Sequence, residues 1–146
     1  MKIESAAPAL GLRICQLDLA KDGDRATDEL RTLLLEHHLL VIAEQQLTTQ
    51  QLMDFGRPWG ELMTHPSSMT HSNPYVQKLA NQGDLKGKGF GAWHSDMTWH
   101  PTPPWITMLH ARTIPLSGGD TAYANQHLAY ESLDRASRDK RRMFRR

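Results

Sequence analysis

A histidine and an aspartate stand two residues apart near the middle of the chain, as His94 and Asp96 in the stretch Trp93-His94-Ser95-Asp96. In an extended segment, side chains at positions i and i+2 point to the same face, so the imidazole and the carboxylate are expected to converge. These groups are two of the three ligands of the 2-His-1-carboxylate facial triad, which binds Fe(II) and leaves positions open for other ligands. The spacing alone is a weak signal of a metal site, which would need one more histidine, so the surrounding sequence must support it.

Downstream of this pair the chain carries an apolar and polar alternation, a proline-containing break, a strand-like run, a glycine turn and a short helix, in that order. The stretches are Met97–Trp99, Thr102–Pro104, Trp105–Arg112, Pro115–Gly119 and Ala129–Leu133. Alternating apolar residues favour strands, and proline and glycine favour the turns between them. Thr121 follows the glycine turn directly, in Gly118-Gly119-Asp120-Thr121.

The order W-H-S-D-x-T-W, T-P-P, a strand and P-L-S-G-G-D-T resembles the taurine dioxygenase (TauD/TfdA) family of Fe(II)- and 2-oxoglutarate-dependent oxygenases. The resemblance extends from about Ile3 to Leu133 and is densest from Trp59 onward. Several separated motifs in the right order make it specific for the family, although not for one substrate. The implied reaction is hydroxylation of a small organic substrate, with formation of succinate and carbon dioxide from 2-oxoglutarate.

By this resemblance, His94 and Asp96 are Fe(II) ligands, and Thr121 helps to hold the distal carboxylate of 2-oxoglutarate. His65 and Trp99 match positions that line the substrate pocket of taurine dioxygenase. No catalytic residue beyond the metal ligands is assigned. Each residue also has a plainer interpretation: the His94 and Asp96 pair as a simple hydrogen bond, and Thr121 as a turn residue that satisfies backbone groups.

Two departures from the family pattern limit what the resemblance implies. With an ungapped match, taurine dioxygenase has Tyr where Ser68 stands and Asn where Phe90 stands, so taurine itself is not the expected substrate. Family members are also longer, and their second histidine ligand and the arginine that pairs with 2-oxoglutarate lie near the far C-terminus. His110 and His127 are poor replacements, because neither occupies the strand that carries the distal ligand.

The sequence therefore predicts a truncated dioxygenase, with a non-catalytic fragment or module that needs a second chain as the alternative. The implied fold is α+β, a double-stranded β-helix (jelly roll) with flanking helices that is incomplete at the C-terminus. We expect residues 1–134 to be the N-terminal part of a TauD/TfdA-like dioxygenase domain and residues 135–146 to be a basic tail.

The tail contains seven Lys or Arg and one Asp, which the overall net charge of +1 conceals. It could be a solvated helix end, the product of a premature stop or frame change, or a nucleic-acid arm. We favour the first two and expect no nucleic-acid partner, because no aromatic platform accompanies the charge.

Helices and strands are expected upstream of the His94 and Asp96 pair. Ile3–Leu17 predicts short strands around a turn, and Thr27–His38 predicts a helix from its leucine spacing. Leu39–Ala43 reads as a buried strand. Thr48 is then expected to cap a second helix that continues to Trp59.

The bulk composition fits a soluble intracellular domain, for which the cytoplasm is the expected compartment, and the family resemblance implies a small-molecule substrate. A length of 146 residues predicts one domain with a sizeable core. Cys15 is the single cysteine, so an internal disulfide is excluded, and the first twenty residues contain no signal-peptide core. No membrane association is expected, because the most apolar stretch, Leu33–Ala43, is too short to span a bilayer. An oligomer or a complementing chain stays open.

Overall fold

The computed structural model describes residues 1–64, 73–79 and 92–143, and for residues 141–143 the backbone only. The elements are β1 (Lys2–Ser5), β2 (Leu12–Cys15), α1 (Leu19–His37), β3 (Leu40–Ile42), α2 (Thr49–Gly56), a 3-10 turn η1 (Arg57–Trp59), α3 (Gln126–Glu131) and α4 (Arg135–Met143). The chain divides into two compact units: the first contains residues 1–46 and 112–146, and the second contains residues 47–111.

The first unit contains a three-stranded sheet in the order β1-β2-β3. Strand β1 pairs antiparallel with β2, with Lys2 opposite Cys15, and β2 pairs parallel with β3. Gly11 stands before β2 at φ +89°, and a Cβ there would lie 3.2 Å from the Leu39 side chain. The predicted turn within Ile3–Leu17 therefore depends on glycine for both its backbone angle and its space.

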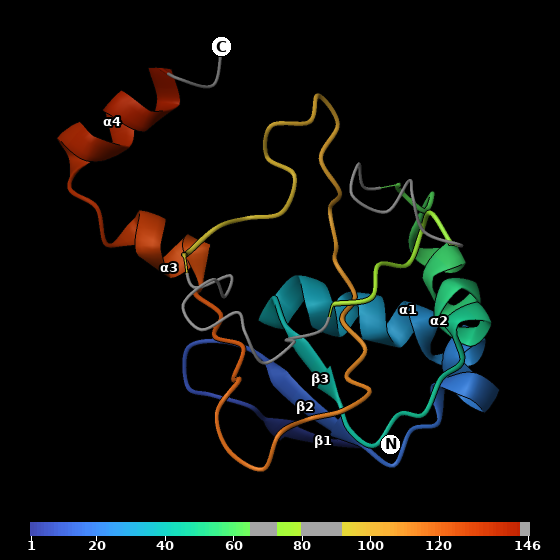
Figure 1. The fold of residues 1–146 in the computed structure, drawn as a ribbon. Helices are drawn as coiled ribbons and strands as arrows, with labels where there is room; N and C mark the ends of the chain where they lie inside the picture. Colours follow the sequence, from blue (N-terminus) through green and yellow to red (C-terminus); the bar gives the residue numbers. More distant parts are fainter. Residues whose placement is uncertain (65–72, 80–91, 144–146) are drawn as a thin grey trace. The chain divides into compact units, whose positions relative to one another are not determined.

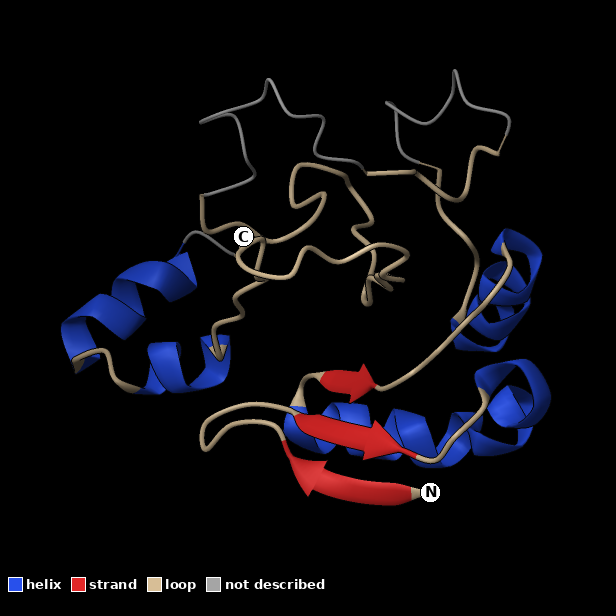
Figure 2. Ribbon diagram, turned by 60° about the horizontal axis from the view of Figure 1, so that its bottom comes forward, coloured by secondary structure: helices blue, strands red, loops and turns tan. Residues whose placement is uncertain are grey.

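Helix α1 connects the parallel strands β2 and β3 and lies along one face of the sheet (Figures 1 and 2). Asp18 caps its start by accepting the Ala20 N–H at 3.0 Å, and contact with Lys21 holds the pKa of the Asp18 carboxyl below its usual range. Gln45 accepts the Leu19 N–H at 2.9 Å and donates to Leu17 O at 2.6 Å. The end of β3 and the start of α1 are thus tied together.

Apolar side chains from β2 and α1 form the core of the first unit. Ile14 and Leu30 are 0% exposed, and Leu12 and Leu19 are also buried. Thr27 is a buried polar residue of this helix, and its hydroxyl donates to Gly23 O at 2.9 Å, which satisfies that group within the core.

The helix predicted over Thr27–His38 begins earlier than expected. Its N-terminal residue is Leu19, since the cap lies at Asp18 and Gly23 packs on the buried face rather than ending the helix. The predicted strand is also shorter and less buried than expected. It covers Leu40–Ile42, and Val41 is 42% exposed because one face of β3 points away from α1.

The second unit begins with the predicted helix cap. Thr48 and Gln51 form a reciprocal capping box, in which each side chain accepts the other residue's backbone N–H. Helix α2 then ends at Gly56 and continues as η1 to Trp59. Phe55 and Trp59 are buried and contact each other edge to face, with ring centroids 5.8 Å apart. The prediction of a helix through Trp59 is confirmed, with its last turn tightened.

The strand predicted over Trp105–Arg112 is not formed. The side chains of residues 104–111 nevertheless alternate strictly between half-buried and exposed. A strand needs backbone hydrogen bonds from a neighbouring strand, and within the described ranges this segment pairs with none. The predicted strand is therefore wrong, although the side chains of this segment alternate in exposure as those of a strand do.

Two helices end the first unit. The short helix expected over Ala129–Leu133 begins earlier, at Gln126, because Asn125 caps it by accepting the Leu128 N–H at 3.1 Å. The Asn125 amide also donates to Ala9 O at 2.8 Å, which attaches α3 to the β1–β2 turn. The basic tail forms α4, and Arg138 donates to Leu133 O at 2.8 Å.

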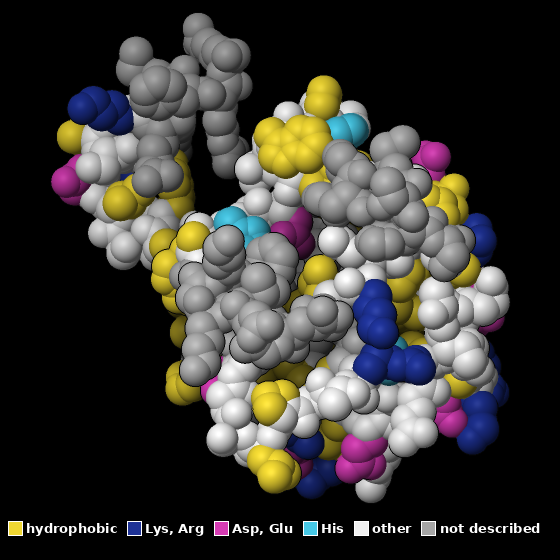
Figure 3. All heavy atoms as spheres, in the orientation of Figure 1, with side chains coloured by type: hydrophobic (Ala, Val, Ile, Leu, Met, Phe, Trp, Pro, Cys, Tyr) yellow, Lys and Arg dark blue, Asp and Glu magenta, His cyan; other side chains and the backbone are white. Residues whose placement is uncertain are grey.

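The mixed sheet and its helices are compatible with the predicted α+β class. Among the described residues no second sheet faces the first, so the jelly roll stays a prediction. Hydrophobic side chains are exposed at several places on the face in Figure 3. No helix in the described part of the chain has the length and apolar character needed to cross a membrane.

Candidate metal site and neighbouring pocket

A tight turn follows the His94 and Asp96 pair directly. Met97 adopts φ +48°, in the left-handed region that non-glycine residues rarely enter, and its carbonyl accepts the His100 N–H at 2.9 Å. The extended alternation expected over Met97–Trp99 is therefore wrong, because the chain reverses there. The side chains of His94 and Asp96 nevertheless converge, because their approach does not depend on an extended backbone over Met97–Trp99.

The imidazole of His94 is oriented by the backbone. Its Nδ1 lies 2.9 Å from Ala92 O. A carbonyl oxygen can only accept, so Nδ1 carries the proton and donates, and Nε2 of the neutral ring then has a free lone pair. This Nε2 lies 3.3 Å from Asp96 Oδ1. In the neutral ring, the unprotonated nitrogen is therefore directed toward the Asp96 carboxylate.

The carboxylate of Asp96 is also held at its outer atom. Thr107 donates its hydroxyl to Asp96 Oδ2 at 2.7 Å, while Oδ1 faces His94. The His94 and Asp96 side chains are 56% and 45% exposed, so a ligand can reach them from solvent.

The geometry fits a bound cation between the two groups. A bare nitrogen and a carboxylate oxygen 3.3 Å apart repel each other unless positive charge lies between them, and a proton or a metal ion can supply it. Metal ions bind imidazole nitrogen and carboxylate oxygen at about 2.0–2.2 Å, so two ligands at right angles lie about 3 Å apart. If a proton rather than a metal ion lies between the two groups, they form a half-exposed surface ion pair that contributes about 0–1 kcal/mol to stability.

No third metal-ligating side chain joins this pair among the residues that the structure describes. In the described ranges, no group of three or more His, Cys, Asp or Glu side chains is placed to hold a metal. His65 lies outside the described residues, as do Ser68 and Phe90. Trp99 is 66% exposed, and its ring contacts His100 edge to face at 5.9 Å between centroids.

Thr121 belongs to the first unit, whereas His94 and Asp96 belong to the second. It is exposed and follows Gly118 and Gly119, both at φ +74°, so the predicted glycine turn is confirmed.

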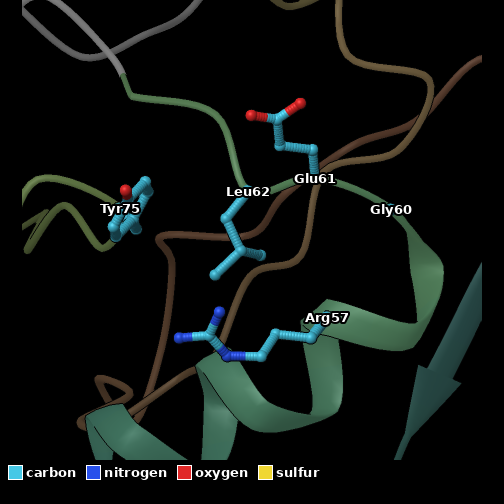
Figure 4. A pocket seen from close by; sticks show the side chains of 5 residues that line it. All are labelled: Arg57, Gly60, Glu61, Leu62 and Tyr75. Carbon is cyan, nitrogen blue, oxygen red and sulfur yellow. The ribbon is translucent and has the colours of Figure 1, made fainter.

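A pocket of about 430 Å³ lies in the second unit and opens to solvent. It is lined by Arg57, Gly60, Glu61, Leu62 and Tyr75. Figure 4 shows the Arg57 guanidinium below Leu62 and open toward Tyr75, while the Glu61 carboxylate points away from them. Arg57 Nε also lies 3.6 Å from Asp54. The pocket therefore combines a cation with an aliphatic and an aromatic wall.

Two residues of this region, Arg57 and Thr107, were not singled out from the sequence. Thr107 lies eleven positions after Asp96, and nothing in the spacing indicates their hydrogen bond. Arg57 precedes the Gly60-Glu61-Leu62 stretch and reads as the end of a helix. A scan for polar residues at alternate positions of the 104–111 segment would have found Thr107, because it shares a face with Trp105 and Leu109.

Comparison with known proteins gives one family match and several partial relatives. The model of the "Taurine catabolism dioxygenase TauD, TfdA family" matches residues 2–144. An alpha-ketoglutarate-dependent sulfonate dioxygenase of Saccharomyces cerevisiae is 27% identical, over 95% of this chain and 37% of its own length. An (S)-phenoxypropionate/alpha-ketoglutarate-dioxygenase of Sphingobium herbicidovorans is 29% identical, over 88% of this chain and 44% of its own length.

An alpha-ketoglutarate-dependent sulfate ester dioxygenase of Pseudomonas putida is 28% identical, over 95% of this chain and 46% of its own length. The chain therefore spans less than half the length of each of these relatives.

Proposed function

Because the chain belongs to the TauD/TfdA family, we propose that it acts as part of an Fe(II)- and 2-oxoglutarate-dependent dioxygenase in which His94 and Asp96 are two of the iron ligands. The main support is the 3.3 Å approach of His94 Nε2 to Asp96 Oδ1, with the outer atoms of both groups already bonded. When bound, Fe(II) and 2-oxoglutarate couple oxidation of a substrate C–H bond by O2 to the formation of succinate and carbon dioxide.

The chain's own residues have distinct tasks in this proposal. The Ala92 carbonyl holds the proton of His94 on Nδ1, which keeps Nε2 free for the metal. Thr121 takes the distal carboxylate of 2-oxoglutarate, next to a glycine turn with two left-handed residues. Trp99 and His65 contact the substrate, and the exposed indole of Trp99 offers an apolar surface for this purpose.

Iron and 2-oxoglutarate binding test the proposal directly. We expect anaerobic titration of the chain with Fe(II) and 2-oxoglutarate to produce the visible charge-transfer band of the chelate, and no band without 2-oxoglutarate. Thr121→Val should require more 2-oxoglutarate for the same band, because it removes the hydroxyl at nearly constant volume. A wild-type chain that gives no band at saturating Fe(II) and 2-oxoglutarate would contradict the proposal.

The substrate we propose is a small organic anion. The relatives described above are named for sulfonate, sulfate ester and phenoxypropionate substrates, each of which joins an acidic group to an organic body. The pocket offers matching chemistry, with Arg57 for the acidic group and Leu62 and Tyr75 for the body.

Arg57→Gln should weaken binding of hexanesulfonate about tenfold, because a hydrogen bond to a charged group contributes about 1.5 kcal/mol at the low end of its range. We use the low end because the Arg57 side chain is 61% exposed. Calorimetry measures the change, with Arg25→Gln as the matched control, since Arg25 pairs with Asp22 on α1. Equal affinity in wild type and Arg57→Gln would remove Arg57 from the substrate site.

The alternative function is a non-catalytic module or a chain that needs a second polypeptide. It is favoured by one observation: in the described part of the chain, the His94 and Asp96 pair is not joined by a third ligand. A charge-transfer band that forms only after a second chain is added would support it. In either case we propose that the complete fold is a jelly roll and that the compartment is the cytoplasm, since Cys15 has no second cysteine to pair with.

A further inference from the structure

Thr107 connects the metal ligand Asp96 to a distant part of the second unit. Its hydroxyl donates to Asp96 Oδ2 at 2.7 Å and leaves Oδ1 directed at His94 Nε2, 3.3 Å away. A carboxylate on an exposed turn can rotate about its side-chain bonds, and a hydrogen bond to one oxygen restricts this rotation. Asp96 therefore receives from Thr107 the same support that His94 receives from the Ala92 carbonyl.

The segment that carries Thr107 is itself attached on one side by Trp105. The Trp105 indole N–H donates to Trp59 O at 3.1 Å, and the two rings lie 6.1 Å apart between centroids. Trp59 is only 5% exposed and packs against buried Phe55. The position two residues before Thr107 is thus fixed to the core formed by α2 and η1.

A second attachment lies three residues after Thr107. The Leu47 N–H donates to His110 Nε2 at 3.5 Å, at the limit of a hydrogen bond, and Leu47 is 3% exposed. The strict alternation of residues 104–111 places Thr107 on the exposed face, where Asp96 can accept its hydroxyl. The hydroxyl is therefore presented by a segment held at both ends.

We propose that Thr107 is a positioning residue for the metal site, which fixes the Asp96 carboxylate with Oδ1 free for the ion. This inference rests on the proposed function, because it takes Asp96 as a metal ligand. A metal-bound carboxylate that loses its supporting hydrogen bond typically binds the metal about 10–100-fold more weakly. A residue with a merely structural role would change the stability of the chain and leave metal affinity unaltered.

The test compares Fe(II) affinity among four forms of the full chain by anaerobic calorimetry: wild type, Thr107→Val, Thr107→Ser and His94→Ala. Valine keeps the volume of threonine without the hydroxyl, whereas serine keeps the hydroxyl. We expect Thr107→Val to bind Fe(II) about 10–100-fold more weakly than wild type, and Thr107→Ser to stay within about threefold. Thermal unfolding of the metal-free forms should give the same midpoint for both Thr107 variants.

The outcomes separate this inference from the function beneath it. If His94→Ala loses Fe(II) binding and Thr107→Val does not, the inference is overturned while the metal site stands. If both Thr107 variants lose affinity and unfold at a lower temperature, the role of Thr107 is structural and the inference is also overturned. Equal binding by wild type and His94→Ala overturns the proposed function, and the inference with it.

Discussion

Replacing His94 by alanine should weaken Fe(II) binding at least about 100-fold, more than the loss of any supporting residue. The reason is that His94 supplies the free Nε2, while its Nδ1 proton is committed to the Ala92 carbonyl at 2.9 Å. Asp96→Asn should weaken Fe(II) binding by a similar factor, because the amide keeps the shape of the side chain but removes the negative charge. Anaerobic Fe(II) titration measures both, and the charge-transfer band should disappear in parallel.

His100→Ala is the matched control for this prediction. His100 lies close in sequence, but its Nδ1 is directed at Thr102 O, 2.9 Å away, and it belongs to the turn after Asp96. Its replacement should leave Fe(II) affinity within about twofold of wild type, as is usual for groups outside the coordination sphere and its supporting bonds. A loss as large as that of His94→Ala would show nonspecific binding by surface histidines.

The second large effect is on stability, at the centre of the first unit. Leu30 is 0% exposed, so Leu30→Ala leaves a cavity between α1 and the sheet that the surroundings fill only in part. We expect a loss of about 2–5 kcal/mol in the free energy of unfolding. Urea unfolding followed by far-ultraviolet circular dichroism measures it.

Leu35→Ala makes the same chemical change on the same helix, where Leu35 is 65% exposed. It should alter the free energy of unfolding by less than about 0.5 kcal/mol. Similar losses for the two variants would mean that the packing of α1 on the sheet differs from that seen here.

Local signals were sufficient wherever a few neighbouring residues decide the structure. The cap at Thr48 was predicted correctly, because its partner Gln51 lies three positions away. The approach of His94 and Asp96 was expected from their spacing, whereas the turn through Met97 directly after them was not, since an extended alternation was expected there. The spacing of two residues thus predicted the contact between the His94 and Asp96 side chains, but it did not predict the backbone conformation of the residues that follow.

The predictions were wrong where contacts between residues far apart in the sequence determine the structure. The start of α1 was missed, since its first backbone N–H is satisfied by Gln45, 26 positions away. The strand predicted over Trp105–Arg112 was wrong, because a strand requires backbone hydrogen bonds to a partner strand, and a local sequence pattern does not show whether such a partner is present. The Thr107 to Asp96 bond was missed for the same reason, because it joins two separate segments.

The βαβ arrangement of β2, α1 and β3 has a consequence for how the chain is made. Strands β1 to β3 and their connecting helix all lie within residues 2–42, so their contacts close short loops. Protein chains emerge from the ribosome N-terminus first, at about 5–20 residues per second. The sheet can therefore begin to assemble before the segment with His94 and Asp96 leaves the ribosome.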